Sequence, residues 1–139
     1  MFLVFRNNGA GYAIKYPEGW AQQGAGRTVT FRDKNNIVRI LIRNGHVSVA
    51  SVGRELKTLR GAQIRQQPRA VTISGAPAVK VVYTTQSAQN AVTGKRVTLT
   101  VDRYYLERAA KEAVVDLGTP VGVDNVDAYR LMIQSFRWR

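Results

Sequence analysis

His46 is the only histidine in this chain of 139 residues, so a Ser-His-Asp arrangement for nucleophilic catalysis would have to be built around it. It lies in a connection that begins with Asn44 and Gly45, and no nucleophile elbow lies nearby. The sequence therefore favours an exposed loop histidine without a catalytic role.

Two pairs of carboxylates are spaced closely enough to serve as acid and base or to hold a metal ion. Asp124 and Asp127 are explained by the start of a helix, where an aspartate caps the helix and opposes its dipole. Glu107 and Glu112 flank a predicted strand turn with basic neighbours, which favours ordinary ion pairs. We predict no catalytic residue, no metal site and no cofactor.

The arrangement of the glycines and the absence of cysteine exclude further kinds of functional site. Segments 9–11 and 24–26 are rich in glycine, but neither completes a phosphate-binding fingerprint, and we interpret both as turns. The chain has no cysteine. This excludes disulfides, cysteine-ligated zinc, iron–sulfur clusters, a cysteine nucleophile and a lipid-bearing cysteine within these residues.

Positive charge is the unusual property of the composition, with 21 Lys and Arg against 9 Asp and Glu. Four basic residues fall opposite the inward-facing valines and isoleucines of their strands: Arg39, Arg43, Lys80 and Arg96. If those strands are neighbours, the four form one basic stripe for nucleic acid, lipid headgroups or an acidic protein. The alternative is a covered face from which the side chains reach water. No helix-turn-helix, zinc-finger or RNA-binding motif is present.

The elements that would position these residues follow from hydrophobic periodicity. Alternating patterns predict strands over 12–16, 28–32, 37–43, 70–73, 78–85, 96–106 and 111–117. Val49, Val52, Leu56 and Leu59 recur at helical spacing, which predicts a helix with Ser48 or Ser51 as its N-cap and Gly61 just past its end. A second helix is predicted from Asn125 to Phe136 with Asp124 as its N-cap. In the second helix the predicted buried stripe is Val126, Tyr129, Ile133 and Phe136.

Hairpin-length connections between these strands favour an α+β fold with an antiparallel β-sheet flanked by helices. A chain of this length buries roughly 68% of its unfolded surface, and no repeat or linker divides it, so we predict a single domain over residues 1–139. The apolar run Met1–Phe5 is shorter than the core of a signal peptide. We expect a soluble chain, with an export signal or anchor upstream of Met1 left open.

The segments Tyr12–Trp20 and Ile133–Arg137, at the two ends of the chain, resemble motifs of the PsbP-like superfamily. The segment Tyr12–Trp20 resembles the aromatic and proline-containing start of that superfamily, and Ile133–Arg137 resembles its final helix ending in Ser-Phe. Between them, Phe31–Asp33, Gly75–Ala78 and Tyr104–Tyr105 fall in similar order. The resemblance covers nearly the whole chain.

This resemblance implies the Mog/PsbP-like α/β sandwich and work by surface contact without catalysis. The superfamily includes a photosystem II subunit, a Ran-binding import factor and many exported bacterial proteins. We therefore expect a non-catalytic binding module, not an enzyme, whose partner is another protein, in an extracytoplasmic location. The alternative is a basic domain that binds nucleic acid or an anionic membrane surface. No binding residue is carried over, because fold does not determine function.

Overall fold

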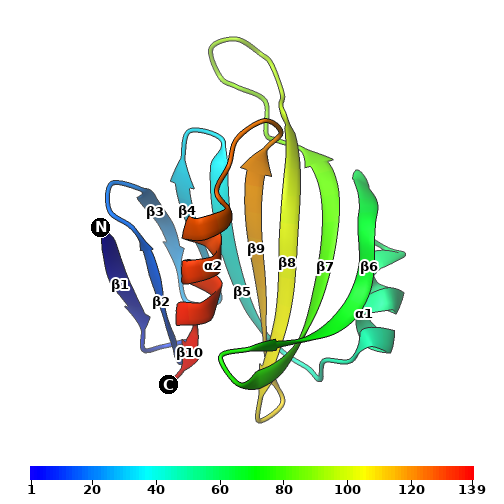
Figure 1. Ribbon diagram of the computed structural model, residues 1–139. Helices are drawn as coiled ribbons and strands as arrows, with labels where there is room; N and C mark the ends of the chain where they lie inside the picture. Colours follow the sequence, from blue (N-terminus) through cyan, green and yellow to red (C-terminus); the bar gives the residue numbers. More distant parts are fainter.

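A large antiparallel sheet forms the centre of the computed structural model, which describes residues 1–139 (Figure 1). Its strands are β3 (Ala21–Ala25), β4 (Thr28–Asp33), β5 (Asn36–Asn44), β6 (Ala62–Ile73), β7 (Ala76–Gln86), β8 (Thr98–Arg108) and β9 (Lys111–Pro120). Their order across the sheet is β3-β4-β5-β9-β8-β7-β6, and every neighbouring pair is antiparallel. The predicted antiparallel sheet is confirmed.

A small sheet and two helices flank the large sheet. The small sheet is β1 (Phe2–Asn7), β2 (Tyr12–Pro17) and β10 (Arg137–Trp138), in the order β1-β2-β10. It lies with α2 (Val126–Ser135) on one face of the large sheet, while α1 (Val49–Leu56) packs on the opposite face near β6 (Figure 1). We call these two faces the α2 face and the α1 face. Neither helix has the length and apolar character needed to cross a membrane.

The connection through α1 determines the strand order. It carries the chain from β5 to the far edge of the sheet, and hairpins then lead from β6 back to β9 beside β5.

Helix α1 starts at the predicted N-cap Ser48, whose hydroxyl accepts the N–H of Ser51 at 3.0 Å. The Ser51 hydroxyl in turn accepts the N–H of Ser48, which completes a capping box.

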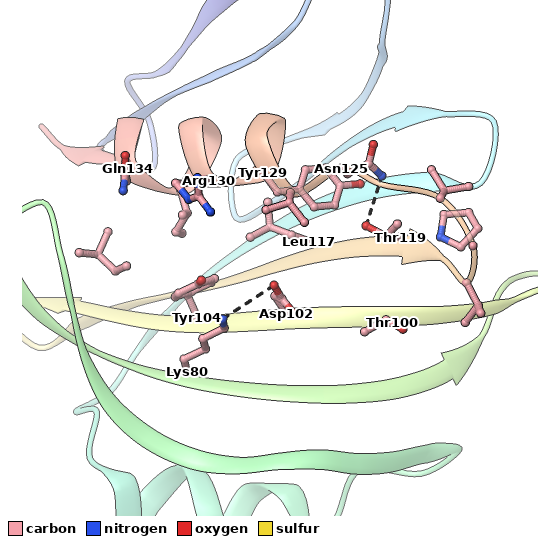
Figure 2. A pocket seen from close by; sticks show the side chains of 17 residues that line it. Lys80, Thr100, Asp102, Tyr104, Leu117, Thr119, Asn125, Tyr129, Arg130 and Gln134 are labelled. Carbon is pink, nitrogen blue, oxygen red and sulfur yellow. Dashed lines mark hydrogen bonds and ion pairs between the residues drawn. The ribbon is translucent and has the colours of Figure 1, made fainter.

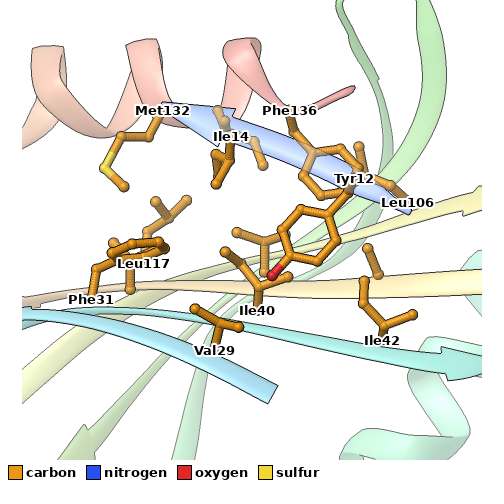
Figure 3. Packing of buried hydrophobic residues seen from close by; sticks show 14 of the residues in the cluster. Tyr12, Ile14, Val29, Phe31, Ile40, Ile42, Leu106, Leu117, Met132 and Phe136 are labelled. Atoms are coloured by element: carbon orange, nitrogen blue, oxygen red, sulfur yellow. The ribbon is translucent and has the colours of Figure 1, made fainter. Parts of the chain in front are cut away.

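Each face of the large sheet carries part of the hydrophobic core. On the α2 face, the main core joins the two sheets and α2, with Ile40, Tyr12 and Phe136 among its members (Figure 3). On the α1 face, Val52 of the helix packs against Val79 and Val81 of β7. Because successive side chains of a strand point to opposite faces, apolar residues of different strands can belong to different cores.

The prediction missed the edges of the fold. Strands β1, β3 and β10 were not expected, and β6 begins well before residue 70. All residues of β3 are exposed, so its sequence carries no apolar alternation. Strand β6 contains Pro68 and register shifts between Ile64 and Arg69. Charged residues, bulges and proline are typical of edge strands, where backbone pairing replaces side-chain burial.

Candidate functional site

A cleft lies between α2 and the part of the large sheet that neither α2 nor the small sheet covers. Its volume is about 560 Å³. Figure 2 shows its two sides, with Lys80, Asp102 and Tyr104 on strands β7 and β8 and with Tyr129 and Arg130 on α2. We call this the α2 cleft.

Strand alternation explains the polar floor of the α2 cleft. On β8, Thr100, Asp102 and Tyr104 line the cleft, whereas the intervening Val101 and Arg103 are buried on the α1 face. On β7, Lys80 lies on the cleft side between residues that face α1. The sequence thus places polar, half-buried side chains where no helix covers the sheet.

Lys80 and Asp102 form the charged centre of the cleft. The Lys80 Nζ atom lies 3.9 Å from Asp102 Oδ2 and 5.4 Å from the centre of the Tyr104 ring. Burial raises the pKa of Asp102, and the positive charge of Lys80 partly opposes this rise. The pair can therefore present either a cation or a hydrogen-bonding carboxyl group to a bound molecule.

Replacing Lys80 with Met is expected to raise the pKa of Asp102 further, because the ammonium group lowers it in the native chain. An acid whose pKa is raised on folding binds its proton more tightly in the folded state. Its contribution to stability is therefore present at low pH and is lost as pH rises through the folded pKa. Carboxyl NMR titration measures the shift, and Lys57→Met, at an exposed site, is the control. A wild-type pKa at or below the ordinary 3.8 would contradict this prediction.

Several polar groups on the α2 side of the cleft make hydrogen bonds that fix α2 to the large sheet. The Tyr129 hydroxyl donates to the carbonyl oxygen of Gly118 at 2.7 Å, and burial raises the pKa of Tyr129 to about 12. The side-chain amide of Asn125 donates to Asn36 Oδ1 at 2.9 Å and to Thr119 Oγ1 at 3.2 Å. These contacts link the start of α2 to β5 and β9.

The mouth of the cleft is apolar. Val121, Val123 and Val126 line it and are 67%, 49% and 59% exposed. The prediction that Val126 belongs to the buried stripe of the helix is therefore wrong. The other three members of that stripe, Tyr129, Ile133 and Phe136, are buried as predicted, and Met132 is buried with them. The helix begins directly after Asn125, its N-cap. The Asp124 side chain, predicted as the N-cap, accepts the N–H of Val126 at 2.9 Å from one position earlier.

The four basic residues predicted as one stripe do not lie together. Arg39 and Arg43 on β5 pair in register with Asp116 and Glu112 of β9 and lie on the α1 face. Lys80 lies on the α2 face, and Arg96 precedes β8, where it donates to the Ser87 carbonyl oxygen at 3.1 Å. The geometric prediction is wrong because β5 turns its apolar residues to the α2 face while β7 turns its own to the α1 face.

Arg43 has a structural role that the sequence did not indicate. Its guanidinium group donates to Glu55 of α1 and, at 2.7 Å, to Glu112 of β9. Burial alone would lower the pKa of Arg43, but the hydrogen bonds to the two carboxylates outweigh it and raise the pKa. Arg43 thus ties α1 to the large sheet.

His46 and the carboxylates considered for catalysis have separate local partners. The exposed His46 lies 3.1 Å from Glu107 through its Nδ1 atom, and the Glu107 carboxylate also accepts the N–H of Val47 at 2.6 Å. The hydrogen bond from Val47, followed by that from His46, lowers the pKa of Glu107. Glu112 turns instead to Arg43, so the two glutamates bind different groups.

Comparison with known proteins shows the fold. No family model and no curated protein matches the sequence. Among solved structures, PsbP of the cyanobacterium Synechocystis is similar over 99% of this chain and 92% of its own, with 18% identity and a TM-score of 0.72. A protein of unknown function from Pseudomonas aeruginosa is similar over 99% and 97%, with 19% identity and a TM-score of 0.56. A protein from Bacteroides thetaiotaomicron matches 98% of this chain with 48% of its own length, at 18% identity and a TM-score of 0.61. The resemblance predicted from the end motifs is confirmed as a PsbP-like fold.

Proposed function

We propose that this domain of PsbP-like fold is a non-catalytic binding module whose partner is another protein, and that the partner docks at the α2 cleft. The observation that carries the proposal is the combination of an apolar mouth with a charged floor. Three exposed valines, from the connection after β9 and the start of α2, line one part of a cleft in which Lys80 and Arg130 are cationic and Asp102 is held beside Lys80. Apolar patches rimmed by polar residues are typical of protein-interaction sites.

Size and charge indicate the kind of partner. A cleft of about 560 Å³ accommodates a few side chains of a protein segment. The net charge of +12 favours encounter with an acidic protein through long-range attraction. We therefore infer a partner that is acidic overall and inserts an apolar segment between α2 and β8. The resemblance to exported members supports an extracytoplasmic location for this pairing.

The chemistry of the cleft supports binding over catalysis. Its centre holds a lysine and an aspartate that pair with each other, whereas His46 lies elsewhere, on the connection between β5 and α1. The Tyr129 hydroxyl is already engaged by a backbone carbonyl group. Nucleophile, base and orienting group therefore do not converge at one point, as an acyl-transfer site would require.

The substitution Val123→Asp is expected to weaken partner binding by at least tenfold. Burying one valine side chain contributes on the order of 1.5 kcal/mol, which corresponds to about a tenfold change in the dissociation constant. Val92→Asp is the matched control, because Val92 is 93% exposed on the loop before β8. A photo-crosslinking residue placed at 123 or at 92 identifies the partner in an extract of the source organism, and a binding titration with that purified partner then compares the variants.

Both measurements have an outcome that rejects the cleft. Equal crosslinking of the same protein from positions 123 and 92 would place the contact outside the α2 cleft. Equal affinity of wild type and Val123→Asp for the purified partner would do the same. Circular dichroism of the variants confirms that the fold is intact, which we expect because Val123 lies in the connection before α2.

A further inference from the structure

A second cavity lies on the α1 face of the large sheet, at the end of the strands away from α1 itself. Its volume is about 330 Å³. Residues of β4 and β5 form one wall, the turn that follows α1 forms another, and β7, β8 and β9 form the floor. We call this the arginine cavity, because Arg32, Arg39, Arg60 and Arg103 all line it.

Only one of these arginines is neutralised by the protein. Arg103 donates to both carboxylate oxygens of Asp116, from Nε at 2.6 Å and from Nη2 at 2.9 Å. Arg39 faces Asp116 across β5 and β9, but both oxygens of that carboxylate are already engaged by Arg103. No carboxylate lies within 4 Å of the guanidinium nitrogens of Arg32, Arg39 or Arg60. Three uncompensated positive charges therefore border the cavity.

Gly118 allows neighbouring side chains to pack closely at the floor of the cavity. This glycine is buried near the C-terminal end of β9, between Ile37 of β5 and Val101 of β8. A Cβ atom at position 118 would lie 2.9 Å from Ile37 Cγ2. Glycine inside a strand is typical of a place where a ligand or another backbone approaches closely. The sequence pattern predicts a strand over 111–117, whereas β9 continues through Gly118 to Pro120.

The rest of the lining is mixed: Asp116, Thr85, Gln86 and Ser87 are polar, and the other side chains are mostly apolar. Leu59 from the turn after α1, Leu99 of β8 and Val101 face the same space as the arginines. A ligand that fits both surfaces has an anionic group for the guanidinium groups and an apolar body for the leucines. Arginine binds phosphate and carboxylate with paired, charge-assisted hydrogen bonds. A single carboxylate would leave most of the positive charge uncompensated, whereas a phosphate monoester carries up to two negative charges.

We propose that the arginine cavity binds a phosphate monoester attached to a small apolar body. Arg39 and Arg60 contact the phosphate, and Leu59 and Leu99 contact the body. The site lies on the opposite face of the sheet from the α2 cleft, so it is independent of the proposed protein-binding function. The same phosphate monoester chemistry occurs in free metabolites and in the headgroup of phosphatidic acid.

Phenyl phosphate is a suitable probe, measured by isothermal titration calorimetry near physiological salt. The double variant Arg39→Gln/Arg60→Gln is expected to weaken its binding by more than about tenfold, because each charge-assisted hydrogen bond contributes substantially. Arg69→Gln/Arg108→Gln is the control with the same change of net charge at exposed positions outside the cavity. We expect less than about a twofold effect there.

Gly118→Val tests the shape of the cavity without changing its charge. The new side chain is expected to abolish binding of phenyl phosphate, and Gly118→Ala to weaken it. If Gly118→Val does not fold, as judged by circular dichroism, the arginine variants alone decide. Vesicles of phosphatidic acid in phosphatidylcholine, compared with phosphatidylcholine alone, form the second arm of the experiment. Binding to these vesicles with the same arginine dependence, and without binding of phenyl phosphate, would identify the source as a lipid.

Two results would overturn the proposal. One is an equal loss of binding in the cavity double variant and the control double variant, which would mean that the phosphate responds to overall charge. The other is the absence of binding to both phenyl phosphate and phosphatidic acid vesicles at millimolar phosphate.

Discussion

Asp116→Ala is expected to lower the free energy of unfolding by about 3 kcal/mol, because it removes the partner of a buried arginine. Arg103 is 7% exposed, and its guanidinium group binds both oxygens of Asp116. Burial by itself would lower the pKa of Arg103, but the hydrogen bonds to Asp116 outweigh it and raise the pKa. In the variant, Arg103 keeps two weaker partners, the Glu55 carboxylate at 3.7 Å and the Tyr105 hydroxyl at 3.2 Å from its Nη1 atom. These contacts limit the loss of stability.

Two further variants distinguish the buried pair from ordinary charge effects. Asp127→Ala removes an exposed aspartate that lies 3.5 Å from Arg130, and it should change stability by less than about 1 kcal/mol. Arg103→Met/Asp116→Leu should recover most of the loss, because no unpaired buried charge remains. Urea unfolding of the four proteins measures these differences. Equal free energies of unfolding for Asp116→Ala and Asp127→Ala would show that the buried Arg103–Asp116 pair stabilises the fold no more than an exposed ion pair does.

Phe31→Ala is expected to cost about 3 to 5 kcal/mol, the usual range for removing a buried phenyl ring. Phe31 of β4 is fully buried. Its ring stacks on Tyr16 of β2 with centres 4.4 Å apart and meets the edge of Phe5 of β1 at 5.4 Å. The ring therefore joins the small sheet to the large sheet, and its removal leaves a cavity between them.

Hydrogen exchange adds a test that is specific to this position. In Phe31→Ala, amides of β1 and β2 should exchange faster than those of β8 and β9, because the small sheet loses its contact with the large one. Leu131→Ala on α2 is the control, since Leu131 is 39% exposed and alanine favours helix. Uniform acceleration across both sheets would contradict a joining role and indicate general destabilisation.

The two cavities lie on opposite faces of the large sheet and differ in the charge of the residues that line them. The α2 cleft combines an apolar mouth with a Lys80–Asp102 pair, whereas the arginine cavity has three uncompensated cations. Binding of nucleic acid or an anionic membrane, expected from the net charge, stays a prediction. Titration against labelled DNA and anionic vesicles at two salt concentrations measures it, since purely electrostatic binding falls steeply as salt rises.

Local patterns were enough to predict the general architecture. Alternation on β5, β7, β8 and β9 predicted the central strands, and Ser48 marked the start of α1. The motif around Tyr12–Trp20 was sufficient to indicate the PsbP-like fold. These signals are readable because each depends on residues close together in the chain. Edge strands such as β3 lacked such a signal, because they are held by backbone pairing and their side chains face water.

The candidate sites could not be predicted in the same way. Alternation correctly showed that Arg39 and Lys80 oppose apolar neighbours, but not that the two strands bury opposite faces of the sheet. Arg39 and Arg60 border one cavity only because the α1 connection carries the chain across that face. The sequence by itself determined strand periodicity, helix starts and overall charge, which are local or additive properties. The tertiary structure decided which charges are paired and which are free, because pairing depends on strand order and on which face of the sheet each strand buries.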